Sequence, residues 1–240
     1  MYESIKTAIY VVGYGGCAAI AALCWGAVRF YRSTQYGRQV KAGLLKTIHD
    51  MGALGEFKLG LTLQRVLPGC RLLFNVYVPH GDGTYTECDC VALHEGRVYV
   101  FEMKNYSGWV FGRERDAFWT QSLNPRSRNR FLNPVKQNAG HIKALSEFSG
   151  CDAASFRSVV VFADRCELKK LDLTGSVPVV RRGELRGILP MVDEVVDCAL
   201  DLDALYEKLY PCTQVSDEVK REHAERVTGK MSEKKKRYKY

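Results

Sequence analysis

The stretch ECDCVALHEGRVYVFEMKN, residues 87–105, alternates its side chains in the way that two neighbouring β-strands do. Glu95-Gly96 in its middle is a two-residue turn signal, which predicts a hairpin of residues 86–93 and 98–104. Apolar residues occupy both faces of both strands, as in a hairpin that is buried on both sides. The charged residues inside it therefore need a physical explanation.

The register of this hairpin brings charged side chains together. Asp89 is predicted to pair with Glu102, and Lys104 shares their face, with Glu87 across from it. Two facing carboxylates repel and are costly to bury unless a cation lies between them. Mg²⁺ or Mn²⁺ prefers such oxygen ligands, so the pattern predicts a metal site at which Lys104 activates water or stabilises a phosphorane-like transition state. The alternative is a surface ladder of ion pairs.

The rest of the chain predicts an α/β domain over residues 44–211. Its first part has the order helix, three strands, helix and strand, at residues 44–67, 71–78, 86–93, 98–104, 133–148 and 156–163. A short strand at 178–180 and helical patterns at 183–189 and 191–210 follow. On the first helix Glu56 shares the apolar stripe, which makes it an acid on the core side.

Residues 7–28 carry no charge over a length that, at roughly 1.5 Å per helical residue, matches a bilayer core. Basic residues follow this stretch, which predicts a single-pass anchor in the cytoplasmic membrane with the C-terminal domain in the cytoplasm. Residues 1–6 are then an N-terminal tail and residues 29–43 a basic linker. A cleaved signal peptide and a lipoprotein are the alternatives. Small residues in the stretch also favour packing of such helices in a homo-oligomer.

The net charge of +8 lies at the two ends of the chain, because residues 44–211 hold 21 basic and 21 acidic residues. The basic C-terminal segment, residues 212–240, is polar enough to predict a disordered tail. The overall charge is therefore no argument for nucleic-acid binding. Nine cysteines without a C-x-x-C pair favour free thiols in a reducing compartment.

One part of the balanced domain is locally basic. Between residues 113 and 143, basic side chains alternate with tryptophan and phenylalanine. This pattern is typical of surfaces that hold a nucleic-acid backbone, and it predicts contacts from Arg126, Arg128, Arg130 and Lys136. A solvated loop over a small aromatic cluster is the alternative.

The chain resembles the nuclease-related domain, or NERD, family in three successive segments: LGEFKLGLTLQRVLPG, ECDCVALHEGRVYVFEMKNYSGWVFGRERDAFWTQ and NPVKQNAGHIKAL. This family is assigned to the PD-(D/E)xK phosphodiesterase superfamily. The resemblance covers about residues 52–150 and implies a restriction-endonuclease-like core, a mixed sheet flanked by helices.

The resemblance also implies a role for five residues. Glu56 corresponds to the first-helix acid, Asp89 and Glu102 to the metal ligands, and Lys104 to the catalytic lysine. Gln137 matches the glutamine that lies beside the active centre on the second helix. His141, one helical turn further on, could face the same site.

Two neighbouring positions depart from the family pattern. Cys88 stands where the superfamily name has proline, and Cys90 stands where members often have histidine. Neither change removes an acid or the lysine, but the missing imidazole weakens the implied site.

The sequence thus predicts a membrane-anchored, metal-dependent nuclease that hydrolyses phosphodiester bonds, with DNA favoured over RNA as its partner. The competing hypothesis is a non-catalytic, membrane-tethered module that binds nucleic acid, lipid or a protein partner.

Overall fold

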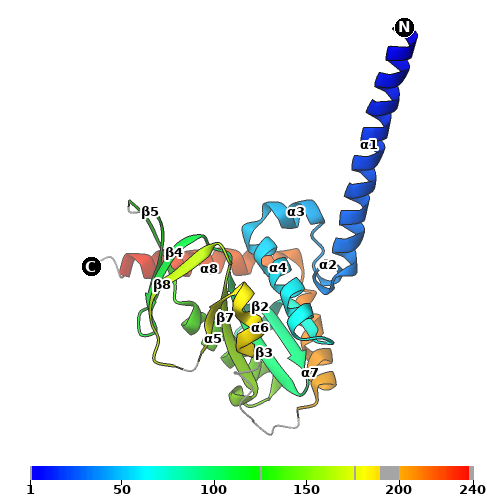
Figure 1. Ribbon diagram of the computed structural model, residues 1–240. Coiled ribbons are helices and arrows are strands. Elements are labelled where there is room, and N and C mark those ends of the chain that lie inside the picture. Colours follow the sequence, from blue (N-terminus) through cyan, green and yellow to red (C-terminus); the bar gives the residue numbers. More distant parts are fainter. Residues whose placement is uncertain (1, 125, 176, 190–199, 238–240) are drawn as a thin grey trace.

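The chain folds as a mixed α/β structure in which helices flank two sheets, as expected of a nuclease-like core (Figure 1). The computed structural model describes residues 2–124, 126–175, 177–189 and 200–237, and within these ranges the side chains of residues 16–230. Of the helix predicted at residues 191–210, residues 191–199 lie outside the described part.

The first sheet contains the strands that the sequence predicts. Its order is β1-β2-β3-β7-β9, and the first three strands are antiparallel while β3, β7 and β9 run parallel. The strands are β1 (Arg71–Pro79), β2 (Tyr85–His94), β3 (Arg97–Lys104), β7 (Phe156–Phe162) and β9 (Val179–Arg181). All five begin and end within one residue of the predicted ranges.

The β2–β3 hairpin has the predicted register. Its pairs run from Cys90 opposite Phe101 to His94 opposite Arg97, around the Glu95-Gly96 turn. Both turn residues have a positive φ, 46° and 77°, which is the backbone of a tight turn between twisted strands. The local turn chemistry therefore determined the register correctly.

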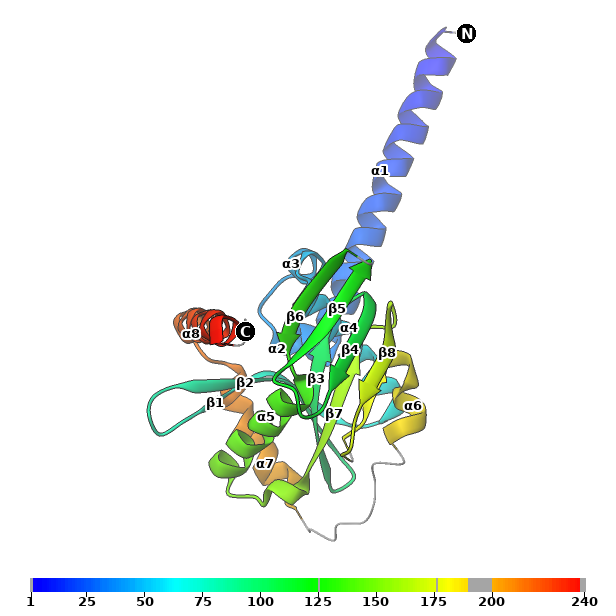
Figure 2. The same ribbon diagram turned by 90° about the vertical axis from the view of Figure 1, so that its left-hand side faces the viewer.

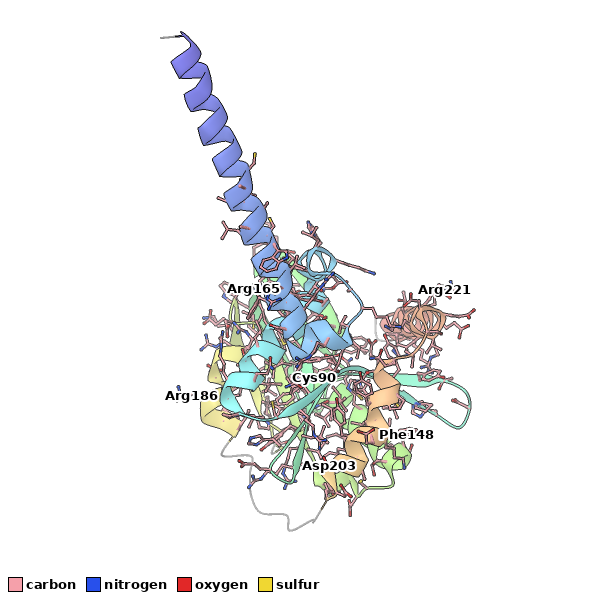
Figure 3. All side chains as sticks on the ribbon, turned by 90° about the vertical axis from the view of Figure 1, so that its right-hand side faces the viewer. Cys90, Phe148, Arg165, Arg186, Asp203 and Arg221 are labelled. Atoms are coloured by element: carbon pink, nitrogen blue, oxygen red, sulfur yellow. The ribbon has the colours of Figure 1, made fainter. Side chains whose placement is uncertain are left out.

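Helices cover both faces of this sheet (Figure 2). On one face, Leu59 and Leu63 of α4 (Met51–Val66) pack in a cluster that includes Cys90, which lies deep in the interior (Figure 3). On the other face, Ala144 and Leu145 of α5 (Pro134–Ser149) pack with α7 (Leu202–Leu209). The single predicted helix at residues 44–67 is divided into α3 (Leu44–His49) and α4, because Asp50 caps the second helix through Gly52 and Ala53.

The side-chain alternation of β1 and β2 inverts in the middle of the two strands. Phe74 and Cys90 pack in the cluster under α4, whereas Val76 and Cys88, each two residues away, pack in the cluster under α5. Strict alternation would place residues two apart on the same face. On β1, Asn75 lies between Phe74 and Val76 and has a φ of 51°, a left-handed conformation that turns the strand over.

A second sheet, which the sequence did not predict, lies beside the first, in the order β6-β5-β4-β8. Its strands are β4 (Gly108–Arg113), β5 (Phe118–Asn124), β6 (Ser127–Leu132) and β8 (Cys166–Asp172). Trp119 is buried and stacks on Phe162 of the first sheet at 6.3 Å between ring centroids. Trp119 and Phe131 therefore join the two sheets through Phe162, while the arginines of β6 are exposed.

The first helix, α1 (Tyr2–Ser33), extends away from the rest of the chain (Figure 1). The side chains of residues 1–15 lie outside the described part. Where the chain is described, none of its helices combines the length and the apolar character that crossing a membrane requires. The predicted membrane span at residues 7–28, part of which falls outside the described side chains, therefore finds no support.

The segment predicted as a basic linker packs against the core instead. Tyr31 and Tyr36 are buried in the cluster under α4. Two glutamines of α2 (Gln35–Gln39) hydrogen-bond the backbone of the edge strand β1, and the Gln35 side chain both accepts from Leu72 N–H and donates to the Cys70 carbonyl, at 2.8 Å each. These polar side chains satisfy backbone groups at the open edge of the sheet, so this segment is tied to the core.

The C-terminal tail, predicted to be disordered, contains α8 (Asp217–Arg237). Lysine, arginine, glutamate and alanine are strong helix formers, so the composition that suggested disorder also suits a solvated helix. The first half of α8 hydrogen-bonds β2, since His223 and Arg226 both contact the carbonyl of Tyr85. This contact places α8 beside the predicted site.

Candidate active site

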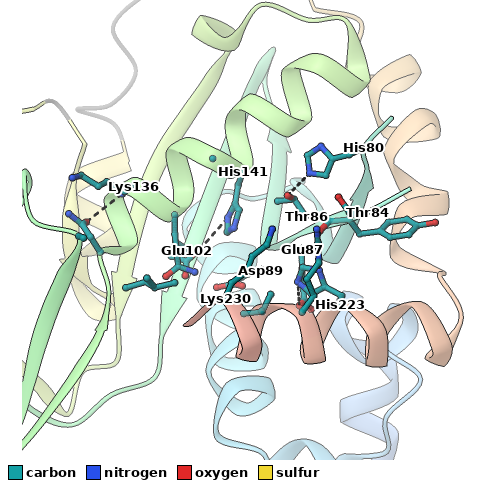
Figure 4. A pocket seen from close by; sticks show the side chains of 18 of the residues that line it. His80, Thr84, Thr86, Glu87, Asp89, Glu102, Lys136, His141, His223 and Lys230 are labelled. Atoms are coloured by element: carbon teal, nitrogen blue, oxygen red, sulfur yellow. Dashed lines mark hydrogen bonds and ion pairs between the residues drawn. The ribbon is translucent and has the colours of Figure 1, made fainter. Parts of the chain in front are cut away.

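A cavity of about 870 Å³ opens where the β1–β2 hairpin, α5 and α8 meet (Figure 4). Asp89, Glu102 and Lys104 line its floor, and Gln137 and Lys136 line it from α5. The structure thus brings five of the predicted site residues together. Glu56, Arg126, Arg128 and Arg130 do not line this cavity.

Glu102 is the most deeply buried acid of the cavity, with a side chain only 1% exposed. Lys104 Nζ donates a hydrogen bond to Glu102 Oε1. Burial would lower the pKa of Lys104, but the charges of Glu102 and Asp89 raise it above its ordinary value. Lys104 is therefore an ammonium group that donates a hydrogen bond to Glu102 in this arrangement.

The second oxygen of Glu102 is not hydrogen-bonded. Oε2 lies 3.3 Å from His141 Nδ1, but neither buried atom has a hydrogen-bond partner. Burial lowers the pKa of His141 to about 4, so the ring is neutral at physiological pH. A buried carboxylate oxygen without a donor is costly, and it is open to a cation.

Asp89 lies beside this pair, though not in the predicted ladder position. The β2–β3 ladder ends at Cys90 and Phe101, and the freed Met103 N–H donates to Asp89 Oδ2 at 2.7 Å. Burial, followed by the charge of Glu102, raises the pKa of Asp89 to about 6. The two carboxylates therefore repel, as expected, but the backbone of β3 holds one of them.

Glu56 lies behind the cavity. Its Oε2 accepts a hydrogen bond of 3.2 Å from the hydroxyl of Tyr36, which anchors it to the N-terminal segment. Burial, the charge of Asp89 and then the charge of Glu87 raise its pKa well above the ordinary value. It is thus near enough to Asp89 to interact with its charge, although it does not face the cavity.

The helix α5 presents Gln137, Lys136 and His141 to the cavity. Asn133 caps this helix by accepting from Val135 N–H and Lys136 N–H, as the Asn-Pro pair predicted. The buried Asn138 amide donates to the Val100 carbonyl and to Ser158 Oγ, at 2.8 Å each. These bonds fix the helix to β3 and β7, so its polar face is held over the carboxylates.

Residues 51–163 match the family model of the nuclease-related domain. This segment of the chain is a NERD domain. An uncharacterized protein from Bacillus anthracis is 35% identical over 123 residues, which are 51% of this chain and 57% of that relative. The chain thus spans little more than half the length of this relative. No solved structure gave a significant match.

The NERD domain holds Glu87 in a different place from the one predicted. Glu87 was expected opposite Lys104, but it pairs with Tyr77 on β1, whose hydroxyl donates to Glu87 Oε1 at 2.7 Å. Its other oxygen lies 3.8 Å from His223 Nε2. The prediction was wrong because β2 leaves β3 before reaching this position.

Four residues of the cavity come from outside the matched NERD segment, and sequence reasoning missed them. His223, Arg226, Val227 and Lys230 line the cavity from α8. Their spacing of three, four and seven residues is that of one helix face, which was the available signal. The polar composition of the segment instead favoured a disordered tail.

The predicted nucleic-acid contacts separate into two groups. Lys136 lines the cavity and donates to the Arg115 carbonyl. Arg128 and Arg130 instead lie exposed on β6, the outer strand of the second sheet, where the guanidinium of Arg130 is 5.0 Å from the Phe118 ring centroid. Arg126 is exposed next to the same strand. These three arginines form a surface of the NERD domain that is separate from the cavity lining.

The described residues contain no cluster of three or more histidine, cysteine or acidic side chains that could hold a metal ion. The donor set at the floor is two carboxylates, Asp89 and Glu102, and one oxygen of Glu102 lacks a donor. Hard divalent cations such as Mg²⁺ often bind through one or two carboxylates with water and substrate oxygens completing the shell. The residues at the floor therefore fit such an ion.

Proposed function

We propose that this chain is a metal-dependent phosphodiesterase that acts on nucleic acid. The match to a nuclease-related domain supports the reaction class. The observation that carries the proposal is the pairing of two buried, repelling carboxylates, Asp89 and Glu102, with the protonated Lys104 at the floor of a cavity. A scaffold has no physical need for this arrangement, because buried like charges cost stability.

Asp89 and Glu102 would hold Mg²⁺ or Mn²⁺, which when bound supplies Lewis-acid stabilisation of a phosphoryl oxygen and a bound water of lowered pKa. The hydrogen bond from Met103 N–H fixes the orientation of Asp89 before any ligand arrives. The unpartnered oxygen of Glu102 is available to a ligand without breaking its bond to Lys104.

Lys104 would act on the phosphate. Its ammonium group is held at Glu102 and keeps its proton because of the surrounding negative charge. It is therefore placed to donate to a phosphate oxygen as charge develops in the transition state. Of the two roles that the sequence predicts for Lys104, this is the one that stabilises the transition state.

Three further residues would support the site. The Gln137 amide can orient a phosphate or a water at the wall of the cavity. His141, neutral and beside Glu102, can hydrogen-bond a ligand without adding charge. Glu56 would orient the region behind Asp89, where it is held by the hydrogen bond that it accepts from Tyr36.

We further propose the cytoplasm as the place of action. The eight cysteines in the described part of the chain are free, five of them buried, which supports a reducing compartment. Protease protection in intact cells tests this, since cleavage of the NERD domain by externally added protease would contradict it.

The test of the activity uses the full chain with labelled DNA and RNA. We expect cleavage with Mg²⁺ or Mn²⁺ and none with excess chelator. Asp89→Asn and Glu102→Gln keep the shape of each side chain, and each should lower the cleavage rate by about 100-fold or more. The released ends, analysed by gel and mass, give the position of the bond that breaks.

The matched control is Glu147→Gln, an exposed glutamate of α5 whose nearest cation, Lys143 Nζ, is 3.8 Å away. It should cleave like the wild type. Circular dichroism and thermal unfolding confirm that each variant is folded. No cleavage by the folded wild type with either ion, or equal cleavage by Asp89→Asn, would overturn the proposal.

A further inference from the structure

The helix α8 lies across one side of the cavity, opposite α5 (Figure 4). His223, Arg226, Val227 and Lys230 form the face that borders it. None of them belongs to the segment that matches the nuclease-related domain, residues 51–163. One wall of the site therefore comes from outside the matched segment.

This wall is fastened to the β1–β2 hairpin at its N-terminal end. His223 Nδ1 lies 3.0 Å from the Tyr85 carbonyl oxygen, which also accepts from the Arg226 guanidinium. The His223 ring meets the Tyr77 ring edge-on at 5.6 Å between centroids. Burial lowers the pKa of His223, so this contact is between neutral aromatic rings.

The two walls carry cations at the rim, and the floor carries the acids. Lys136 projects from α5, and Arg226 and Lys230 project from α8. Lys230 is exposed, whereas Arg226 is half-buried and already bound to the hairpin. Cations on both sides of a groove can follow a phosphate backbone, and Tyr85 adds an aromatic ring against which a base can stack.

The dimensions of the site favour one strand over two. A cavity of about 870 Å³ is within the range that encloses a small ligand, so it takes a few nucleotides. The hairpin, α5 and α8 border it on three sides.

We propose that α8 forms the second wall of a groove for a single strand of nucleic acid, in which Arg226 and Lys230 bind its phosphates opposite Lys136. The choice of nucleic acid rests on the proposed function. Arg226 and Lys230 are positioning residues here, since they hold the backbone and not the reacting atoms. The family segment supplies the chemistry, and the C-terminal helix determines which substrate enters.

Fluorescence anisotropy of labelled oligonucleotides tests this with the full chain. Single-stranded DNA, single-stranded RNA and a blunt DNA duplex of the same sequence are titrated with protein in Ca²⁺, with gels confirming that each probe stays intact. We expect the better single strand to bind at least about 10-fold more tightly than the duplex. The two single-strand arms show whether the 2′-hydroxyl matters.

Two variants examine the wall itself. Lys230→Gln should reduce the slope of log affinity against log salt by about 0.7, the value for one phosphate contact on a single strand. Arg226→Gln with Lys230→Gln should reduce it by about 1.4 and weaken single-strand binding by about 10-fold. Lys230→Gln alone guards against loss of the helix, because Arg226 also fastens α8.

Arg221→Gln is the control on the same helix. Arg221 lies away from the cavity lining and faces Glu218 at 3.7 Å (Figure 3). This variant should keep both the affinity for the single strand and the salt slope.

Three outcomes would overturn the proposal: equal binding of the duplex, an unchanged salt slope in Lys230→Gln, or tighter binding by the double variant. The last would show that α8 blocks the cavity and does not bind the strand. Since binding is measured without cleavage, an inactive protein that still prefers single strands would refute the proposed function alone.

Discussion

The floor of the cavity and the strand β6 of the second sheet both carry charged side chains, but those at the floor are buried and those on β6 are exposed. At the floor, Glu102 is 1% exposed and is bonded to Lys104, which is 16% exposed. On β6, Arg128 and Arg130 stand in solvent. Both regions are rich in charge in the sequence, but only the first pays the cost of removing charge from water.

The difference shows which charges in such a sequence carry information. Exposed arginines on a strand are compatible with many structures, since each changes the folding free energy by little. Buried charges that repel one another, as Asp89 and Glu102 do, lower stability and persist where a function uses them. Four experiments test how large this contrast is.

The largest effect is expected from Lys104→Met. It leaves Glu102 buried without its cation, which should lower the free energy of unfolding by about 3–5 kcal/mol at pH 8. Urea unfolding followed by circular dichroism measures it. Lys143→Met, the exposed counterpart on α5, should cost less than about 0.5 kcal/mol. If Glu102→Gln does not restore most of the loss in the double variant, the two residues are not energetically coupled.

Asp89→Asn should stabilise the protein in chelator at pH 8. The pKa of Asp89 is about 6 in the folded chain against an ordinary 3.8, so the folded state binds the proton more tightly. The contribution of Asp89 to the free energy of unfolding is therefore fully present below about pH 4 and is lost as the pH rises through about 6. The variant removes this loss and should gain up to about 3 kcal/mol at pH 8, with little gain at pH 4.

Asp82 provides the opposite case on the same hairpin. Hydrogen bonds from Thr84 lower the pKa of this exposed carboxyl. The contribution of Asp82 to the free energy of unfolding is present above its ordinary pKa and is lost as the pH falls. Asp82→Asn should therefore lower the stability of the protein at pH 8. A gain in both variants would show that removing any negative charge stabilises the chain.

Divalent ions should raise stability by an intermediate amount. At about 10 mM Mg²⁺, dissociation constants between about 0.1 and 1 mM correspond to about 1–3 kcal/mol. Thermal unfolding with and without the ion measures this. The gain should shrink at pH 5, where Asp89 is protonated, and be absent in Asp89→Asn. An equal gain in that variant would place the ion elsewhere.

The smallest effect is expected on β6. Arg128→Gln with Arg130→Gln should change the free energy of unfolding by less than about 0.5 kcal/mol each. In the single-strand binding assay it should change the salt slope less than Lys230→Gln does. A larger change would make the outer strand part of the binding surface and remove the contrast with the floor.

Local signals in the sequence were sufficient for much of the fold. The Glu95-Gly96 turn determined the hairpin register, and Asn133-Pro134 marked the start of α5. Both depend on the backbone preferences of adjacent residues, which are present in any context. The clustering of Asp89, Glu102 and Lys104 followed from the hairpin, although the direct pairing of the two acids did not.

Features that depend on distant parts of the chain could not be predicted. The second sheet requires β4 and β8 to pair in parallel, with Gly108 opposite Cys166. The helix α8 contacts the carbonyl of Tyr85, a residue 138 positions earlier in the chain than His223. The ladder end at Asp89 follows from tertiary geometry, since the Met103 N–H is satisfied by a side chain and not by a neighbouring strand.

The left-handed Asn75 divides the hairpin of β1 and β2 into two halves with independent faces. The inner half, residues 71–74 with their partners 90–93, lies between the two sheet-covering helices and is buried except at Arg71. The outer half also packs in the cluster under α5, but its Tyr85, Thr86 and Glu87 line the cavity, and Tyr85 contacts α8. Substrate preference can therefore change during evolution by replacing residues of the outer half, while the folding of the inner half is left as it is.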